Sequence, residues 1–168
     1  MIKIIGSVCI ISGCAAMGFS IALTHKRNAY ILQQLLLALE FMLCELPERM
    51  PPLPILSRDT AQHTSGKIRQ IFAELSEILD LQEYANTEQC MNTIVDRHTL
   101  PESAKLNLLR LGQSLGRFDI PGQVSGLISI KQSVERELNA ILTNMEVRIR
   151  SYKTLGICAG AALAILFI

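Results

Sequence analysis

The stretch LGQSLGRFDIPGQ, residues 111–123, has the pattern of a turn between two helices. Gly116 stands where a helix ends in the left-handed conformation, and Gly112, one turn earlier, lets a neighbouring helix approach closely. Asp119 is a suitable N-cap, and Pro121 follows in the first turn of a new helix, where its missing N–H is tolerated. The stretch therefore predicts the corner of an αα-hairpin. It is not a phosphate-binding loop, because no strand precedes the glycines and no lysine–serine pair follows them.

Helical spacing continues on both sides of this corner, and no strand pattern of any length interrupts it. The preceding helix starts at Pro101 and has apolar residues at i, i+4, i+7 and i+11, on one face: Ala104, Leu108, Leu111 and Leu115. Earlier in the chain, a helix is predicted over residues 28–46, followed by a short helix that ends at about residue 63. Two more helices are predicted over residues 65–82 and 87–97. The sequence predicts an all-α bundle of about six helices.

The first of these helices is apolar on more than one side. Its main stripe is joined by further apolar residues at other angles: Leu32, Leu35, Leu36, Leu39, Leu43 and Leu46 in the stripe, with Ile31, Leu37, Phe41 and Met42 beside it. This pattern favours a central helix of the bundle, although the extra apolar face also suits a partner. The prolines that follow, Pro47, Pro51, Pro52 and Pro54, cannot all lie inside a helix, so a loop is predicted there.

The last helix is predicted to be long, because neither glycine nor proline occurs from residue 127 to 155 and the apolar spacing persists. The apolar positions are Val124, Leu127, Val134, Leu138, Ile141 and Met145. If it is unbroken from Pro121 into the C-terminal segment, this helix is about 70 Å long. Such a length is explained by a helix that runs from the bundle into a membrane.

Both ends of the chain are apolar. Hydrophobic residues make up 49% of the sequence and aromatic residues only 5%, with a mean hydropathy of +0.32. Residues 4–23 carry no charge and would span about 30 Å as a helix, which is the thickness of the hydrocarbon core of a bilayer. Residues 154–168 are also uncharged but reach only about 22 Å, which makes this second span marginal. The sequence thus divides into an N-terminal transmembrane helix (1–24), a helical bundle (28–153) and a C-terminal membrane segment (154–168).

Basic residues lie on the inner flank of each apolar segment. His25, Lys26 and Arg27 follow the first segment, while Arg148, Arg150 and Lys153 precede the second. The positive-inside rule then places the middle of the chain in the cytoplasm. The cysteines agree, since there is no CxxC pair and no disulfide-dense pattern.

An alternative topology comes from residues 11–14, which resemble the lipidation signal of an exported lipoprotein. If that signal were used, Cys14 would be the first mature residue and the domain would lie outside the cytoplasm. Against this alternative, the apolar run continues to Leu23 instead of stopping after the cysteine.

Each apolar segment has a face of small residues at a spacing of four. These residues are Ser12, Ala16 and Ser20 in the first segment, and Gly156, Gly160 and Ala164 in the second. Small residues at this spacing allow membrane helices to pack closely. The two faces are predicted to pack on each other or on other membrane subunits.

No pattern predicts catalysis or a cofactor. His25, His63 and His98 are far apart and have no metal-binding spacing. Cys44 lies on an apolar helix and Cys90 has no basic cluster nearby, so both favour packing over reactivity. We expect no catalytic residue, no metal, no cofactor and no small-molecule substrate, and conclude that the chain is not an enzyme.

The charges differ between the two halves of the middle region. Residues 40–97 carry ten acidic and five basic residues, and residues 98–153 carry five acidic and eight basic. This division suits an electrostatic partner surface on the acidic half, and membrane headgroups or an acidic partner on the basic half. Ordinary solvated helix faces explain it equally well. Nucleic-acid binding is disfavoured by a net charge of only +1 and the lack of an arginine-rich run.

The whole chain resembles the stage III sporulation protein AB family. Three regions carry the resemblance: the corner at Leu111, Gly112, Leu115, Gly116, Asp119 and Gln123; the early helix at Gln34, Leu35, Ala38, Leu39 and Glu45; and the K-x-LG stretch at Lys153, Leu155 and Gly156. The sequence departs from the family at residues 47–53, where a tyrosine–glycine turn is usual, so the geometry of this loop does not follow from the resemblance.

The resemblance implies a subunit of the channel-like complex between mother cell and forespore in endospore-forming bacteria. The bundle would be similar to the helical domains of the type II secretion platform protein, and would link a cytoplasmic secretion-type ATPase (stage III sporulation protein AA) to other membrane subunits. The implied location is the mother-cell membrane around the forespore, with the central domain cytoplasmic. The residues alone also fit a membrane-anchored helical interaction or sensor protein unrelated to sporulation.

Overall fold

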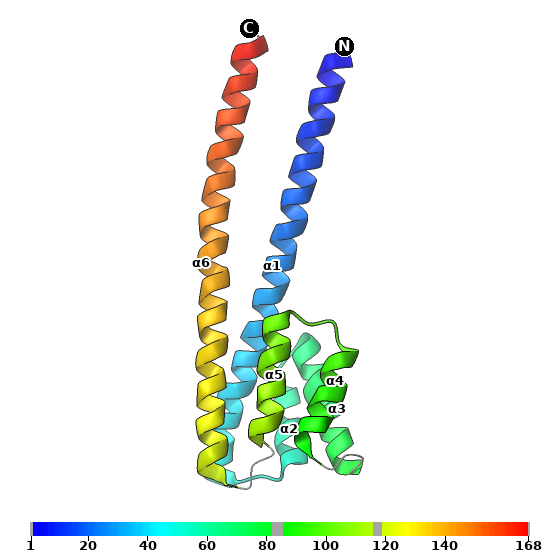
Figure 1. The fold of residues 1–168 in the computed structure, drawn as a ribbon, viewed down its shortest axis with the longest axis vertical. Coiled ribbons are helices and arrows are strands. Elements are labelled where there is room, and N and C mark those ends of the chain that lie inside the picture. The colour runs from blue at the N-terminus through cyan, green and yellow to red at the C-terminus, as the bar shows by residue number, and fades with distance from the viewer. Residues whose placement is uncertain (1, 82–85, 116–118, 168) are drawn as a thin grey trace. The chain divides into compact units, whose positions relative to one another are not determined.

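The computed structural model contains six helices and, in the part of the chain that it describes, no strand (Figure 1). The backbone is described except for residues 1, 82–85, 116–118 and 168, and side chains are described for residues 24, 26–81, 86–115 and 119–143. The elements are α1 (Ile2–Arg49), α2 (Leu53–His63), α3 (Gly66–Leu81), α4 (Thr87–Arg97), α5 (Glu102–Leu115) and α6 (Ile120–Phe167). The predicted all-α class is confirmed.

The chain forms two compact units. One unit is Asn28–Leu138, here called the bundle, and the other combines Met1–Arg27 with Asn139–Ile168. Helix α1 crosses the boundary between the units at residues 27–28, and α6 crosses it at residues 138–139. Both helices, of 48 residues each, therefore belong to both units. The bundle holds the described core.

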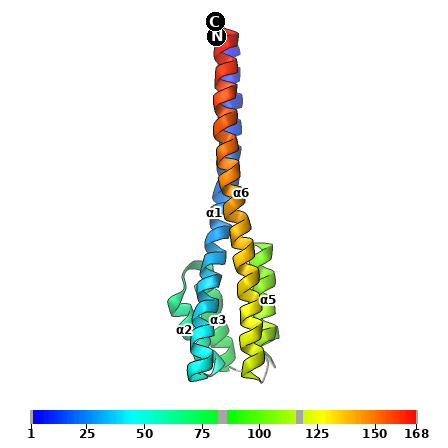
Figure 2. The same ribbon diagram turned by 90° about the vertical axis from the view of Figure 1, so that its left-hand side faces the viewer.

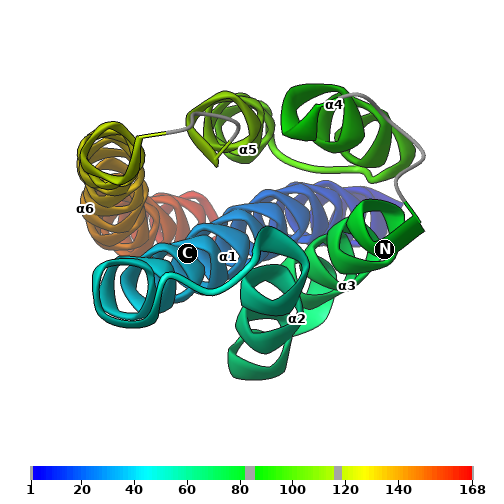
Figure 3. The same cartoon turned by 90° about the horizontal axis from the view of Figure 1, so that it is seen from below.

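Within the bundle, α4 packs on α3 and α5, and α2 packs on α3. Viewed along the helices, α6, α5 and α4 form one row that faces α1 and α3, and α2 lies on the outer side (Figure 3). The view at right angles shows α2 and α3 beside the cyan part of α1, and α5 beside the yellow part of α6 (Figure 2). The bundle ends of α1, α3 and α5 and the starts of α2, α4 and α6 lie at one end of the bundle (Figure 1). We call this the turn end.

The bundle part of α1 is the central helix that its apolar pattern predicts. Six of its larger apolar side chains and two alanines are buried: Ile31, Leu32, Leu35, Leu39, Met42 and Leu46, with Ala29 and Ala38. Such burial on several sides requires neighbours on several sides, here α2, α3 and α6. In contrast, Tyr30 and Leu37 are half-exposed, so the helix also has an apolar outer face.

The segment Lys26–Arg49 is long and apolar enough to cross a membrane, with a mean hydropathy of 1.5 over its 18-residue window. It is the one such segment in the described part of the chain, and its buried leucines form the core of the bundle. A core helix meets the same criterion of length and composition. The predicted spans at 4–23 and 154–168 belong to α1 and α6, but their side chains lie outside the described residues.

The predicted proline-rich loop is present at residues 50–52, but the prediction that the preceding helix ends at about Leu46 is wrong. Helix α1 continues through Pro47 to Arg49, and Pro54 lies in the first turn of α2, so that only three residues separate the helices. Pro47 is tolerated because it removes a single backbone hydrogen bond in the last turn. Pro54 is tolerated because the N–H groups of a first turn have no partner in their own helix.

The other helices follow their sequence patterns. The predicted faces of α3 and α5 are buried at Ile68, Ile71, Phe72, Leu75 and Ile78, and at Ala104, Leu108, Leu111 and Leu115. Asn86 caps α4 by accepting a hydrogen bond from the Gln89 N–H at 2.9 Å. The last helix is a single α6 of 48 residues, as its lack of glycine and proline from residue 127 to 155 predicts.

Candidate interaction surfaces

The αα corner has the geometry expected of a helix start. The Gly122 N–H donates to Asp119 Oδ2 at 2.8 Å, and the Gln123 N–H donates to the Asp119 carbonyl at 3.1 Å. Asp119 is therefore the N-cap of α6, with Pro121 in the first turn. Helix α5 ends at Leu115, so the predicted left-handed cap at Gly116 lies just outside the described residues.

The remaining corner residues are structural in their surroundings. Leu111, Gly112, Leu115 and Gln123 are all buried. A Cβ added to Gly112 would stand 2.7 Å from the Met91 Cβ and 3.3 Å from the Thr87 carbonyl oxygen of α4. Gly112 thus permits the close approach of α4 and α5 that the sequence predicts there.

A second close approach joins α5 to α6 and is not evident from the sequence. A Cβ added to Gly126 would stand 2.1 Å from Ser114 Oγ and 2.9 Å from Ser114 Cβ. Gly126 and Ser114 are 12 residues apart on either side of the corner. Two glycines, Gly112 and Gly126, therefore allow α4, α5 and α6 to pack closely on one another. The sequence predicted only the contact at Gly112.

Polar side chains tie the outer helices to α1 and to each other. Gln34 Oε1 accepts a hydrogen bond from the Ser65 N–H at 2.8 Å, which joins α1 to the turn between α2 and α3. Lys131 Nζ of α6 lies 3.0 Å from Glu40 Oε1 of α1, and this hydrogen bond raises the pKa of Lys131 above its usual 10.5. This pair also joins the acidic and basic halves of the sequence, so the two halves are not separate surfaces at this point.

The histidines and cysteines have separate surroundings. His63 stacks on Phe41 with ring centroids 4.2 Å apart, and His98 Nε2 lies 3.0 Å from Glu74 Oε1. Cys44 is exposed and Cys90 is buried. Among the residues with described side chains, no group of three or more His, Cys, Asp or Glu could hold a metal ion. His25 falls outside them.

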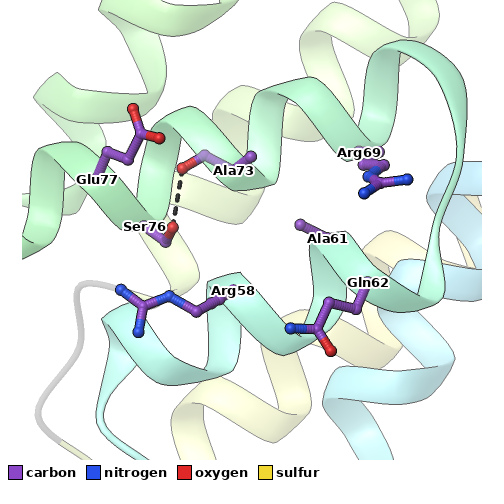
Figure 4. A pocket seen from close by; sticks show the side chains of 7 residues that line it. All are labelled: Arg58, Ala61, Gln62, Arg69, Ala73, Ser76 and Glu77. Atoms are coloured by element: carbon purple, nitrogen blue, oxygen red, sulfur yellow. Dashed lines mark hydrogen bonds between the residues drawn. The ribbon is translucent and has the colours of Figure 1, made fainter.

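A groove of about 270 Å³ lies between α2 and α3 (Figure 4). Its floor is made of the small residues Ala61, Ala73 and Ser76, and Ser76 Oγ donates to the Ala73 carbonyl at 2.8 Å. Arg58, at one end of the groove, forms an ion pair with Asp80 of α3. The groove has no nucleophile with a neighbouring base, which is the arrangement that covalent catalysis requires.

The turn end carries exposed apolar side chains that the sequence patterns did not single out. Met50, Ile55 and Leu81 are 62%, 46% and 69% exposed. Met50 also has a φ of +46°, a left-handed conformation that residues other than glycine seldom adopt. In the sequence, the run of prolines in residues 47–54 was the only sign of this surface.

The predicted membrane-packing faces cannot be placed among these surfaces. Ser12, Ala16 and Ser20 belong to α1, and Gly156, Gly160 and Ala164 belong to α6, but the side chains of all six lie outside the described residues. Their role in packing remains a prediction.

The fold is that of an all-α protein built on two long helices. Its described residues pack helix against helix and leave apolar side chains exposed at the surface. The chain belongs to the stage III sporulation protein AB family, because the model of that family matches residues 3–168. This places the chain among sporulation proteins.

A solved structure gives independent support for the fold. The chain is similar to a structure of stage III sporulation protein AB, with 21% sequence identity and a TM-score of 0.62. The match covers 71% of this chain and 97% of that one. At this identity the similarity concerns the fold alone. No curated protein matches the chain.

Proposed function

We propose that this protein is a non-enzymatic membrane scaffold in the secretion-like channel complex between mother cell and forespore. It binds a cytoplasmic secretion-type ATPase, stage III sporulation protein AA, and holds it beside the membrane subunits. The observation that carries the proposal is the family match over residues 3–168, which includes both apolar ends as well as the bundle.

Two further observations support a scaffold. Helices α1 and α6 each include a part of the bundle and an apolar terminal sequence, so each helix links the two along the chain. The bundle is also tied across its helices by close glycine contacts and by the Lys131–Glu40 pair. A scaffold that joins a membrane segment to a cytoplasmic surface needs helices that run through both and contacts that hold the bundle together.

The proposal places the apolar ends in the mother-cell membrane around the forespore and the bundle in the cytoplasm. The basic residues Lys26 and Arg27, which follow the first apolar sequence, favour this orientation. In the proposed assembly, the small-residue faces of the two apolar sequences pack on each other or on membrane subunits.

Affinity purification of a tagged copy from detergent-solubilised membranes of sporulating cells tests the proposal. We expect the ATPase and small multi-span membrane subunits to be recovered in stoichiometric amounts. Recovery of the tagged protein alone, with the ATPase present in the same lysate, would contradict it. An untagged strain processed in parallel controls for non-specific recovery.

A further inference from the structure

The turn end of the bundle combines a strained backbone with an exposed apolar surface. Met50, the first residue after α1, has a φ of +46° and is 62% exposed. Glycine is the usual residue at this position after a helix, because a Cβ in the left-handed region costs about 1 kcal/mol. The chain therefore keeps a large apolar side chain in solvent at a position where a glycine would relieve strain. Strain of this kind often marks a functional site.

Other exposed apolar residues lie at the same end. Helices α2 and α3 run antiparallel, and the Arg58–Asp80 ion pair joins the middle of α2 to the last turn of α3. Ile55, one turn before Arg58, and Leu81, directly after Asp80, are 46% and 69% exposed. We call Met50, Pro52, Ile55 and Leu81 the tip patch.

The geometry of the tip patch suits binding. Pro51 and Pro52 fix their own φ angles, so the turn that carries Met50 loses little conformational freedom when a partner binds. Exposed apolar side chains that a proline-rich turn holds in place, on a protein of which 18% of the residues are charged, are typical of a contact surface.

The charges around the tip patch are mainly acidic. Arg49 lies 3.3 Å from Glu45, and Arg58 pairs with Asp80, so both arginines are neutralised within the bundle. Glu48 is exposed and, among the described residues, forms no ion pair. Asp119, also exposed at the turn end, caps α6 and forms no ion pair with another described residue. Among the described residues at this end, acidic side chains thus outnumber basic ones: Glu45, Glu48, Asp80 and Asp119 against Arg49 and Arg58.

We propose that the tip patch is the surface on which the cytoplasmic ATPase docks, through an apolar patch on the ATPase bordered by lysine or arginine. This inference rests on the proposed function and adds the location of the contact. The acidic border complements a basic protein surface and repels anionic lipid headgroups, which excludes the membrane as the occupant. The patch follows α1, whose beginning carries the apolar sequence and whose end carries the turn.

The first test is site-specific photo-crosslinking in sporulating cells. A photoreactive residue replaces Ile55 in the full-length protein, and Leu106 of α5, which is 47% exposed and lies away from the turn end, provides the matched control. We expect a crosslink from position 55 to the ATPase and none from position 106. A crosslink to the ATPase from 106 alone would overturn the inference while leaving the proposed function in place.

The second test measures affinity between the purified ATPase and the full-length protein in nanodiscs. Met50→Gly relieves backbone strain, so its thermal stability should equal or exceed that of the wild type, whereas its affinity should fall about tenfold because an apolar anchor is lost. Ile55→Ser should also weaken binding about tenfold, Glu48→Lys several-fold, and Leu106→Ser not at all. Binding by wild type should weaken as ionic strength rises.

The outcomes separate the two claims. If wild type binds the ATPase and both Met50→Gly and Ile55→Ser bind with unchanged affinity, the tip patch is not the docking surface. If wild type does not bind the ATPase at all, the proposed function fails together with this inference. If wild type forms dimers in nanodisc-free detergent solution that Ile55→Ser dissociates, the patch is an interface between two copies, which also overturns the inference.

Discussion

Replacing Gly112 by alanine tests how tightly α4 and α5 are packed. The added Cβ would lie 2.7 Å from the Met91 Cβ, whereas ordinary contacts of this kind begin at about 3.4 Å, so the helices must separate by about 0.7 Å. The Met91 Cβ is attached directly to the backbone of α4 and cannot rotate away. Overpacking of this kind costs about 1 to 3 kcal/mol, while alanine in place of glycine in a helix returns about 1 kcal/mol.

The expected result of Gly112→Ala is a net loss of about 1 kcal/mol of unfolding free energy. For a unit the size of the bundle, the melting temperature should fall by about 4 °C. The assay is thermal unfolding of the full chain in detergent, followed by circular dichroism at 222 nm. In a Met91→Gly background the same substitution should cost less, because the Cβ that it would meet is then absent. A melting temperature that rises in the wild-type background would refute the close-packing argument.

Four further predictions use the same protein. Asp119→Ala should lower the unfolding free energy by about 1 kcal/mol, and Asp119→Asn by much less, since asparagine also caps helices; equal losses in chemical denaturation would argue against a cap. Ser57→Ala should leave stability unchanged or raise it by about 1 kcal/mol, because Ser57 Oγ is buried without a hydrogen-bond partner among the described residues; a clear loss of melting temperature would show that the hydroxyl has a partner. The contribution of Lys131 should be fully present below pH 10.5 and disappear as the pH rises through its raised pKa, since the folded state holds the proton more tightly; Lys131→Met should abolish this alkaline dependence, and an unaltered pH profile would contradict the pair with Glu40. Gly116→Ala should cost about 1 kcal/mol if residue 116 is left-handed, as the corner sequence predicts; an unchanged melting temperature would refute that conformation.

The sequence was most informative where short-range physics decides the structure. The spacing of Ala104, Leu108, Leu111 and Leu115 predicted the buried face of α5, because a helix of 3.6 residues per turn places these positions together. Asp119 was predicted as a cap for a similar reason, since its side chain bonds a backbone N–H only three residues away. The family followed from the corner and the early helix, which the model match over residues 3–168 supports.

The errors arose where several weak effects compete. Four prolines within eight residues predicted a loop but not its length, and because helices tolerate proline in a first turn and near an end, the loop is only three residues long. The close contact between Gly126 and Ser114 depends on how two helices pack, which no local pattern records. The tip patch was missed for the same reason, because Leu81 and Ile55 are brought to one end of the bundle by the antiparallel arrangement of α2 and α3.

We propose that this protein holds the ATPase at the membrane. The direct measurement is the share of the ATPase that sediments with membranes from sporulating cells with and without this protein. We expect the ATPase to move to the soluble fraction when the protein is absent and to return to the membrane when the full chain is supplied. An ATPase that remains membrane-bound to the wild-type extent in the absence of the protein would contradict the account.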